Sequence, residues 1–200
     1  MNIKIENVEK TLEKSLEDAC GLTTYRKTLE LDSIMDKDYR KMFTSYYRIR
    51  RDSEWLESFY SYMYEIKDRE DITFEEILCK LSSWEHSVKV SGKNPNGCAR
   101  TIEVSFSSKL LATISPDNPI WDSQVVKALN IKIKEKGEWG ERIKAYAHAY
   151  GELKKAVQEY INSDDGKKAI ELFDNKFPNY ADVSDYKKID FYLWNLGKNK

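Results

Sequence analysis

The sequence predicts an all-α protein with at most one small β-hairpin. Apolar residues recur at three- and four-residue intervals through most of the 200 residues, which is the period of amphipathic helices. A hydrophobic fraction of 40%, with 5 Trp, 13 Tyr and 7 Phe, is enough for a buried core and excludes a disordered chain. The length suits a single helical domain over residues 1–200, or two lobes of about residues 1–85 and 86–200.

The N-terminal part of the chain carries start and stop signals for helices. Thr73 is followed three residues later by Glu76, the spacing of a capping box, in which both residues satisfy free backbone N–H groups at a helix start. Cys20 and Gly21 have the composition of a helix stop. From these signals and the apolar period we expect helices over residues 7–19, 36–51 and 52–67, and another that begins at residue 73.

The segment from His86 to Val104 departs from the helical period. Short alternating runs flank residues 94–97, whose sequence is NPNG. This pattern fits a small β-hairpin near residues 87–104, and it equally fits a long basic loop.

Further helices are predicted in the C-terminal part. The segment 105–126 has the pattern of two short helices joined by a turn with two prolines. A long helix follows Gly140, because apolar residues recur along one face as far as Ile161. The last two helices are expected to begin at Asp164 and Ser184, and the final one is expected to end at Gly197.

Composition excludes several classes of function. Two histidines and three widely spaced cysteines do not build a zinc site or a disulfide framework. Hydrolase, nucleotide-triphosphatase and dinucleotide-binding motifs are absent from the sequence, so we expect no metal and no cofactor. The chain shows no signal peptide and no apolar run of about 18 residues, so we expect a cytoplasmic protein that does not enter a membrane.

Charge is balanced overall and basic in one segment. The formal net charge of −1 excludes a globally basic nucleic-acid binder. Residues 86–136 nevertheless carry eight Lys or Arg against four Asp or Glu. Such a segment fits a surface that faces phosphates, although charge runs are more often solvated.

The segment SFSSKLLATISPDNPIWDSQVV, residues 105–126, contains a candidate catalytic pair. If Ser105 or Ser107 caps the first helix, Lys109 falls in or near the first turn, where the helix dipole lowers the pKa of an amine. Lys109 also borders an apolar helix face, and desolvation acts in the same direction. Both effects favour the neutral, nucleophilic amine. Asp122 opens the next helix, as a capping carboxylate does, and the short turn could bring it close to Lys109.

These residues resemble the helix-hairpin-helix DNA glycosylases. That family has a hairpin of the form GVGxK and an aspartate-opened helix of the form VDTHV. Here SFSSK, residues 105–109, is similar to the first element, with serines in place of both glycines, and IWDSQV, residues 120–125, is similar to the second. The resemblance implies a compact glycosylase-like fold, in which Lys109 attacks the sugar C1′ and Asp122 stabilises the positive charge that develops on the deoxyribose.

The resemblance also implies a substrate and the residues that bind it. The substrate would be duplex DNA with a damaged or mispaired base, which is flipped into a pocket. The helix around FYLWNL, residues 191–196, would close that pocket. The residues implied to contact the substrate are Arg100, Ser105, Ser107, Ser108, Trp121, Ser123, Gln124, Lys127 and Trp194.

A second segment, residues 45–64, interleaves arginines with aromatic residues, as nucleic-acid surfaces do. The aromatic residues also fall at helical steps, which favours core packing. In that case Arg48, Arg50 and Arg51 are expected to be solvated or paired with Asp52 and Glu54.

Three functions therefore stay open from the sequence. The first is a DNA glycosylase that also cleaves abasic strands. The second is a catalytically inactive DNA-binding module on the same scaffold, which the two serines in place of glycines favour. The third is a helical interaction protein without a nucleic-acid role, which the near-neutral charge favours.

Overall fold

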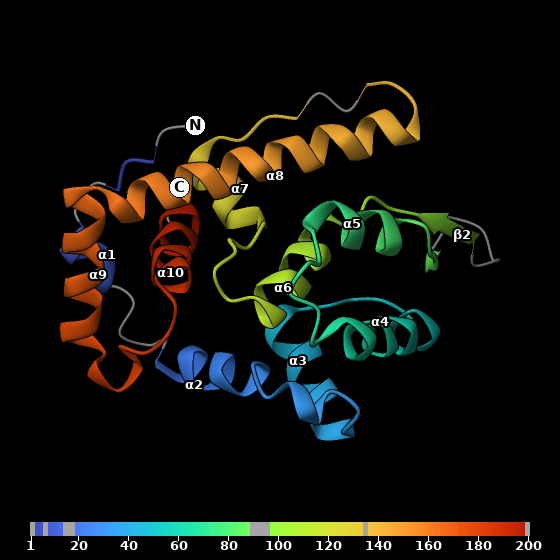
Figure 1. Ribbon diagram of the computed structural model, residues 1–200, viewed down its shortest axis with the longest axis horizontal. Helices are drawn as coiled ribbons and strands as arrows, with labels where there is room; N and C mark the ends of the chain where they lie inside the picture. Colours follow the sequence, from blue (N-terminus) through green and yellow to red (C-terminus); the bar gives the residue numbers. More distant parts are fainter. Residues whose placement is uncertain (1–2, 6–7, 14–18, 89–96, 134–135, 199–200) are drawn as a thin grey trace.

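Helices make up most of the molecule, as the apolar period predicts, and the all-α expectation is confirmed. The computed structural model describes residues 3–5, 8–13, 19–88, 97–133 and 136–198 (Figure 1). The helices are α1 (Val8–Glu13), α2 (Ala19–Thr28), α3 (Lys37–Tyr47), α4 (Ser53–Ile66), α5 (Phe74–Ser82), α6 (Val104–Ile114), α7 (Ser123–Leu129), α8 (Trp139–Asn162), α9 (Asp164–Lys176) and α10 (Asp185–Lys198). Short 3-10 turns, η2 (Leu31–Ser33) and η3 (Pro178–Tyr180), precede α3 and α10.

The segment after α5 forms a hairpin. Strands β1 (Glu85–Val88) and β2 (Gly97–Arg100) pair antiparallel, with Glu85 opposite Arg100 and Val88 opposite Gly97. This result confirms the hairpin over the long basic loop. Residues 94–96 of the expected turn lie outside the described residues.

Most of the helix starts expected from capping residues are confirmed. Asp52 accepts a hydrogen bond from the backbone N–H of Trp55 at 2.9 Å, and Thr73 accepts one from Glu76 at 3.2 Å. Asp122 likewise accepts the N–H of Gln124 at 2.9 Å. These caps are predictable because each joins residues only two or three positions apart.

Three expected helix ends are wrong. The helix expected over residues 36–51 ends at Tyr47, because Arg48 adopts a left-handed backbone conformation. Cys20 and Gly21 lie inside α2, which continues to Thr28 because Leu22 and Tyr25 are buried in the core. Gly197 lies inside α10 and does not end it. A Cβ at Gly197 would lie 2.0 Å from the carbonyl oxygen of Gln124, so this glycine serves the close approach of α10 to α7.

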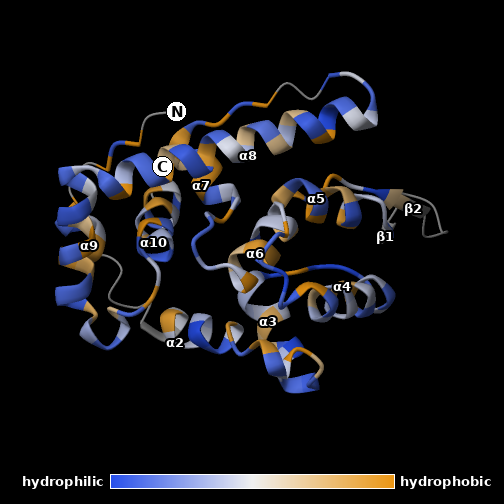
Figure 2. Ribbon diagram, in the orientation of Figure 1, coloured by the Kyte–Doolittle hydropathy of each residue, from blue (hydrophilic) through white to orange (hydrophobic). Residues whose placement is uncertain are grey.

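The helices pack around one continuous cluster of buried apolar side chains. α7 packs against α10. α5, which precedes residue 86, packs against α6 and α8, which follow it, so the segments 1–85 and 86–200 are in contact. Hydrophobic residues are frequent on α6 and α7, whereas α9 has a large hydrophilic face (Figure 2). None of the helices in the described part of the chain combines the length and apolar character needed to cross a bilayer.

Candidate functional site

Lys109 lies in the interior, on the middle of α6. Helix α6 begins at Val104, so the expectation that Ser105 or Ser107 caps it is wrong, and SFSSK is helical with no hairpin turn at these residues. The helix starts early because the preceding residue, Glu103, is held by contacts with two other segments. Lys109 therefore lies in the second turn of α6, after the residues whose N–H groups are free, and the argument that places it in the first turn does not apply.

The amine of Lys109 joins two helix ends. Its Nζ donates a hydrogen bond to the backbone oxygen of Tyr47, the last residue of α3, at 3.2 Å. The same Nζ lies 3.8 Å from Oδ2 of Asp122, which caps the start of α7. The expected approach of Lys109 and Asp122 is thus confirmed. The amine meets the negative end of one helix and a carboxylate at the positive end of another.

Two lysines in this region have pKa values that are shifted in opposite directions. Burial lowers the pKa of the Lys109 amine, and Arg48 acts in the same direction, while Asp122 and Asp190 oppose them without reversing the shift. Burial also acts to lower the pKa of Lys187, but Asp190, 2.7 Å from its Nζ, raises that pKa well above the ordinary value. Lys187 therefore stays an ammonium ion, whereas Lys109 reaches its neutral form at a lower pH than an ordinary lysine does.

The pKa of Lys109 is expected to fall further in Asp122→Asn. Because the attraction of Asp122 raises that pKa, its removal should extend the neutral form of the amine to lower pH. The amide oxygen can still accept from Gln124, so the cap is kept. The measurement is an NMR titration of the lysine Nζ resonances. Asp174→Asn, which removes a partner of Lys188, should leave the Lys109 titration unchanged, and an unchanged or raised pKa in Asp122→Asn would contradict the prediction.

Two of the serines implied to bind substrate are fully buried. The hydroxyl of Ser108 donates to the backbone oxygen of Ser105 at 2.9 Å and accepts the backbone N–H of Trp121 at 2.8 Å. Ser107 and Ser108 have no exposed surface. Ser108 thus fastens the residue before Asp122 to α6, which positions the carboxylate near Lys109.

The other implied contact residues are spread over several elements. Trp121 is buried, with its ring 6.2 Å from that of Tyr146 at 75°, an edge contact within the core. Trp194 is half-buried on α10, where Nζ of Lys198 lies 5.1 Å from its ring. The remaining residues are Ser123 and Lys127, which are exposed on α7, Gln124, which is half-buried there, and Arg100, which is exposed on β2. Within the described residues, no hydrogen bond, ion pair or ring contact joins Arg100 or Trp194 to Lys109.

Sequence reasoning missed three residues around Lys109. Tyr47 supplies its hydrogen-bond acceptor, and the charges of Asp190 and Arg48 act on its pKa. The only sequence signal was the arginine-rich end of the aromatic segment 45–64, and it did not indicate proximity to residue 109. For Arg51 the expectation was wrong, because it pairs with Glu103 at 2.7 Å instead of Asp52 or Glu54.

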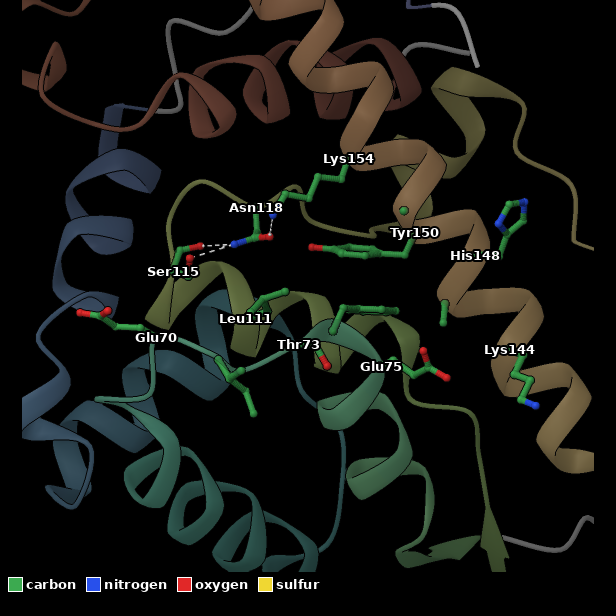
Figure 3. Close-up of a pocket in the computed structure, with 14 residues that line it drawn as sticks. Glu70, Thr73, Glu75, Leu111, Ser115, Asn118, Lys144, His148, Tyr150 and Lys154 are labelled. Carbon is green, nitrogen blue, oxygen red and sulfur yellow. Dashed lines mark hydrogen bonds between the residues drawn. The ribbon is translucent and has the colours of Figure 1, made fainter.

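A pocket of about 700 Å³ is separate from this site (Figure 3). It lies between the start of α5, the end of α6 and the middle of α8, where Phe74 and Tyr150 stack with ring centres 3.7 Å apart. Leu111 lines it from α6. Leu111 is two residues after Lys109, about 200° around the helix axis, so the cavity and the amine occupy opposite faces of α6.

The described residues contain no group of three or more His, Cys, Asp or Glu side chains arranged to hold a metal ion. The chain matches no protein-family model, no curated protein and no solved structure.

Proposed function

We propose that this protein binds DNA and uses Lys109 as an amine nucleophile that excises a base and cleaves the strand at the resulting abasic site. The observation that carries the proposal is the buried amine 3.8 Å from the Asp122 carboxylate, with a pKa lowered by burial. A neutral amine is the nucleophilic form of lysine. A fixed carboxylate beside it can offset the positive charge that develops on the sugar.

The proposed reaction consists of bond exchange and proton transfer. The Nζ lone pair forms a bond to C1′, and the bond from C1′ to the base breaks, with its electron pair going to the base, which takes a proton from water. Asp122 accepts the proton that the attacking amine loses and returns it to O4′ as the C1′–O4′ bond breaks, so that opening of the sugar ring gives a protonated Schiff base. Loss of a C2′ proton then breaks the bond from C3′ to the phosphate oxygen, and hydrolysis of the imine releases Lys109. No oxidant or reductant enters these steps.

A second candidate is a helical protein without this chemistry, in which Lys109 has a structural role. The hydrogen bond from Lys109 to Tyr47 favours it, because a cation at a helix C-terminus is stabilising. The helical conformation of residues 105–109 also departs from the hairpin of the glycosylase family. In this case Lys109 holds the end of α3 against the start of α7.

Borohydride trapping separates the two candidates. The parent protein, Lys109→Gln and Lys188→Gln are each incubated with a duplex that contains an abasic site, and the reduced protein–DNA adduct is quantified. Lys188 is the matched control, because it is also buried and lies 2.8 Å from an aspartate, Asp174, at another place in the fold. We expect the adduct in the parent and in Lys188→Gln, and its loss in Lys109→Gln.

Two outcomes would reject the enzymatic proposal. One is an adduct that persists in Lys109→Gln at the parent level. The other is a folded parent protein that forms no adduct, which leaves the structural role. Circular dichroism shows whether Lys109→Gln is folded. If it is not, the trapping rate of the parent is followed against pH, and it should rise as the Lys109 amine loses its proton.

A further inference from the structure

Helix α3 ends in a backbone conformation that is unusual for the residue that occupies it. Arg48 follows α3 with φ 52° and ψ 44°, and its backbone N–H bonds back to the carbonyls of Thr44 and Ser45. Asn130 ends α7 with almost the same angles, φ 52° and ψ 42°. This left-handed conformation is ordinary for Gly and Asn, but it brings the Cβ of other residues close to the backbone. Arginine at this position is therefore strained.

The side chain of Arg48 is not engaged by a carboxylate. It is exposed, and no acidic group in the described ranges lies within ion-pair distance of it. Other arginines of the chain do pair with acids: Arg26 with Asp182, Arg40 with Glu57, Arg51 with Glu103, and Arg69 with Asp71 and Glu76. Among the residues that the structure describes, no ion pair offsets the strain at Arg48.

Arg48 is adjacent to the Lys109 site through the backbone. The carbonyl that accepts the Lys109 hydrogen bond belongs to Tyr47, so the next Cα along the chain is that of Arg48. The charge of Arg48 acts on the Lys109 amine and lowers its pKa. The exposed side chain of Arg48 therefore leaves the backbone next to the carbonyl that the buried Lys109 amine contacts at the end of α3.

We propose that Arg48 binds a backbone phosphate of DNA beside the nucleotide that Lys109 attacks. This inference rests on the proposed function and adds the residue that positions the substrate. A sugar attacked at C1′ has a phosphate on each side, and the planar guanidinium can bind two phosphate oxygens at once. Strained residues are retained where the side chain has a task that a relaxed residue cannot perform, and here the task is to hold the phosphate.

The test uses the same replacement at both left-handed positions, Arg48→Gly and Asn130→Gly. Binding is measured by fluorescence anisotropy with a duplex that carries a tetrahydrofuran abasic analogue, which cannot form a Schiff base, at several salt concentrations. We expect Arg48→Gly to raise the Tm by about 2 °C through relief of strain. The same variant should weaken binding about tenfold and reduce the salt slope by about one phosphate contact. Asn130→Gly should change neither the affinity nor the salt slope.

The outcomes for Arg48 and for the proposed function are distinguishable. Parent-level binding by Arg48→Gly, or a fall in its Tm, overturns the Arg48 proposal, and adduct formation through Lys109 is unaffected by that result. Weakened binding by Arg48→Gly without any adduct in the parent supports the phosphate contact and rejects the catalytic role of Lys109. A parent protein that does not bind the duplex overturns both.

Discussion

Gly197→Ala is expected to destabilise the protein by about 3 kcal/mol or more, although alanine is the better helix residue. A Cβ at position 197 would lie 2.0 Å from the carbonyl oxygen and 2.5 Å from the carbonyl carbon of Gln124. Both are backbone atoms, so the clash cannot be relieved by a rotamer change. Helices α10 and α7 must move apart, and their shared buried surface is then lost. For a chain of this size the Tm should fall by about 6 to 12 °C.

The matched control is Gly151→Ala in the middle of α8. No atom lies within 4 Å of a Cβ built at this exposed glycine, so the intrinsic preference for alanine is unopposed. We expect Gly151→Ala to stabilise the protein by about 0.5 to 1 kcal/mol. Thermal unfolding of both variants is the measurement. Equal, stabilising effects would show that α10 does not approach α7 as closely as described.

The consequence of Gly197→Ala extends to the candidate site. Gln124 is the second residue of α7, and its backbone N–H is the group that Asp122 caps. A shift of α7 away from α10 therefore moves the carboxylate that lies near Lys109. The pKa of Lys109 should therefore change in this variant, because the charge of Asp122 is one of its causes.

Local signals in the sequence were sufficient for most helix starts, though not for that of α6, and for the approach of Lys109 to Asp122. Thr73 and Asp122 bond to backbone groups within three residues, so their environment is contained in a few sequence positions. Lys109 and Asp122 are separated by half a helix and a short turn, which limits how far apart they can lie. Their geometry was predictable because little of it depends on the rest of the fold.

Contacts between distant segments could not be predicted in this way. Gly197 resembles a helix stop until α7 is placed against it, and nothing near Lys109 in the sequence indicates that Tyr47 accepts its hydrogen bond. The early start of α6 has the same origin. It depends on Glu103, which is fixed by Arg51 and by the hydroxyl of Ser82.

Glu103→Gln is expected to cost about 3 kcal/mol, because it leaves a buried guanidinium without its counter-charge. Arg51 donates to both carboxylate oxygens of Glu103, at 2.7 and 3.0 Å, and the side chains are only 17% and 4% exposed. The guanidinium also lies over Phe106, 4.9 Å from the ring centre. The pair thus holds the start of α6, the helix that carries Lys109, against the segment between α3 and α4.

The control for Glu103→Gln is Asp32→Asn, which removes a partner of Lys67 at 2.8 Å on the surface. The Asp32 carboxylate is 99% exposed, so water and salt screen its attraction to Lys67, and the free energy of unfolding should hardly change. Chemical denaturation of both variants gives the comparison. A small effect of Glu103→Gln, equal to that of Asp32→Asn, would mean that the Arg51–Glu103 pair does not hold α6.

The double variant Arg51→Met with Glu103→Leu tests whether the Arg51–Glu103 ion pair stabilises the fold or specifies where α6 begins. Burial raises the pKa of Glu103 even though the hydrogen bonds and charge of Arg51 lower it, so desolvation outweighs the attraction between the two groups. Removal of both charges should therefore recover most of the stability lost in Glu103→Gln. A double variant that is stable but whose α6 no longer begins at Val104 would show that the ion pair specifies the helix start. One that is no more stable than Glu103→Gln would instead make the pair itself a net source of stability.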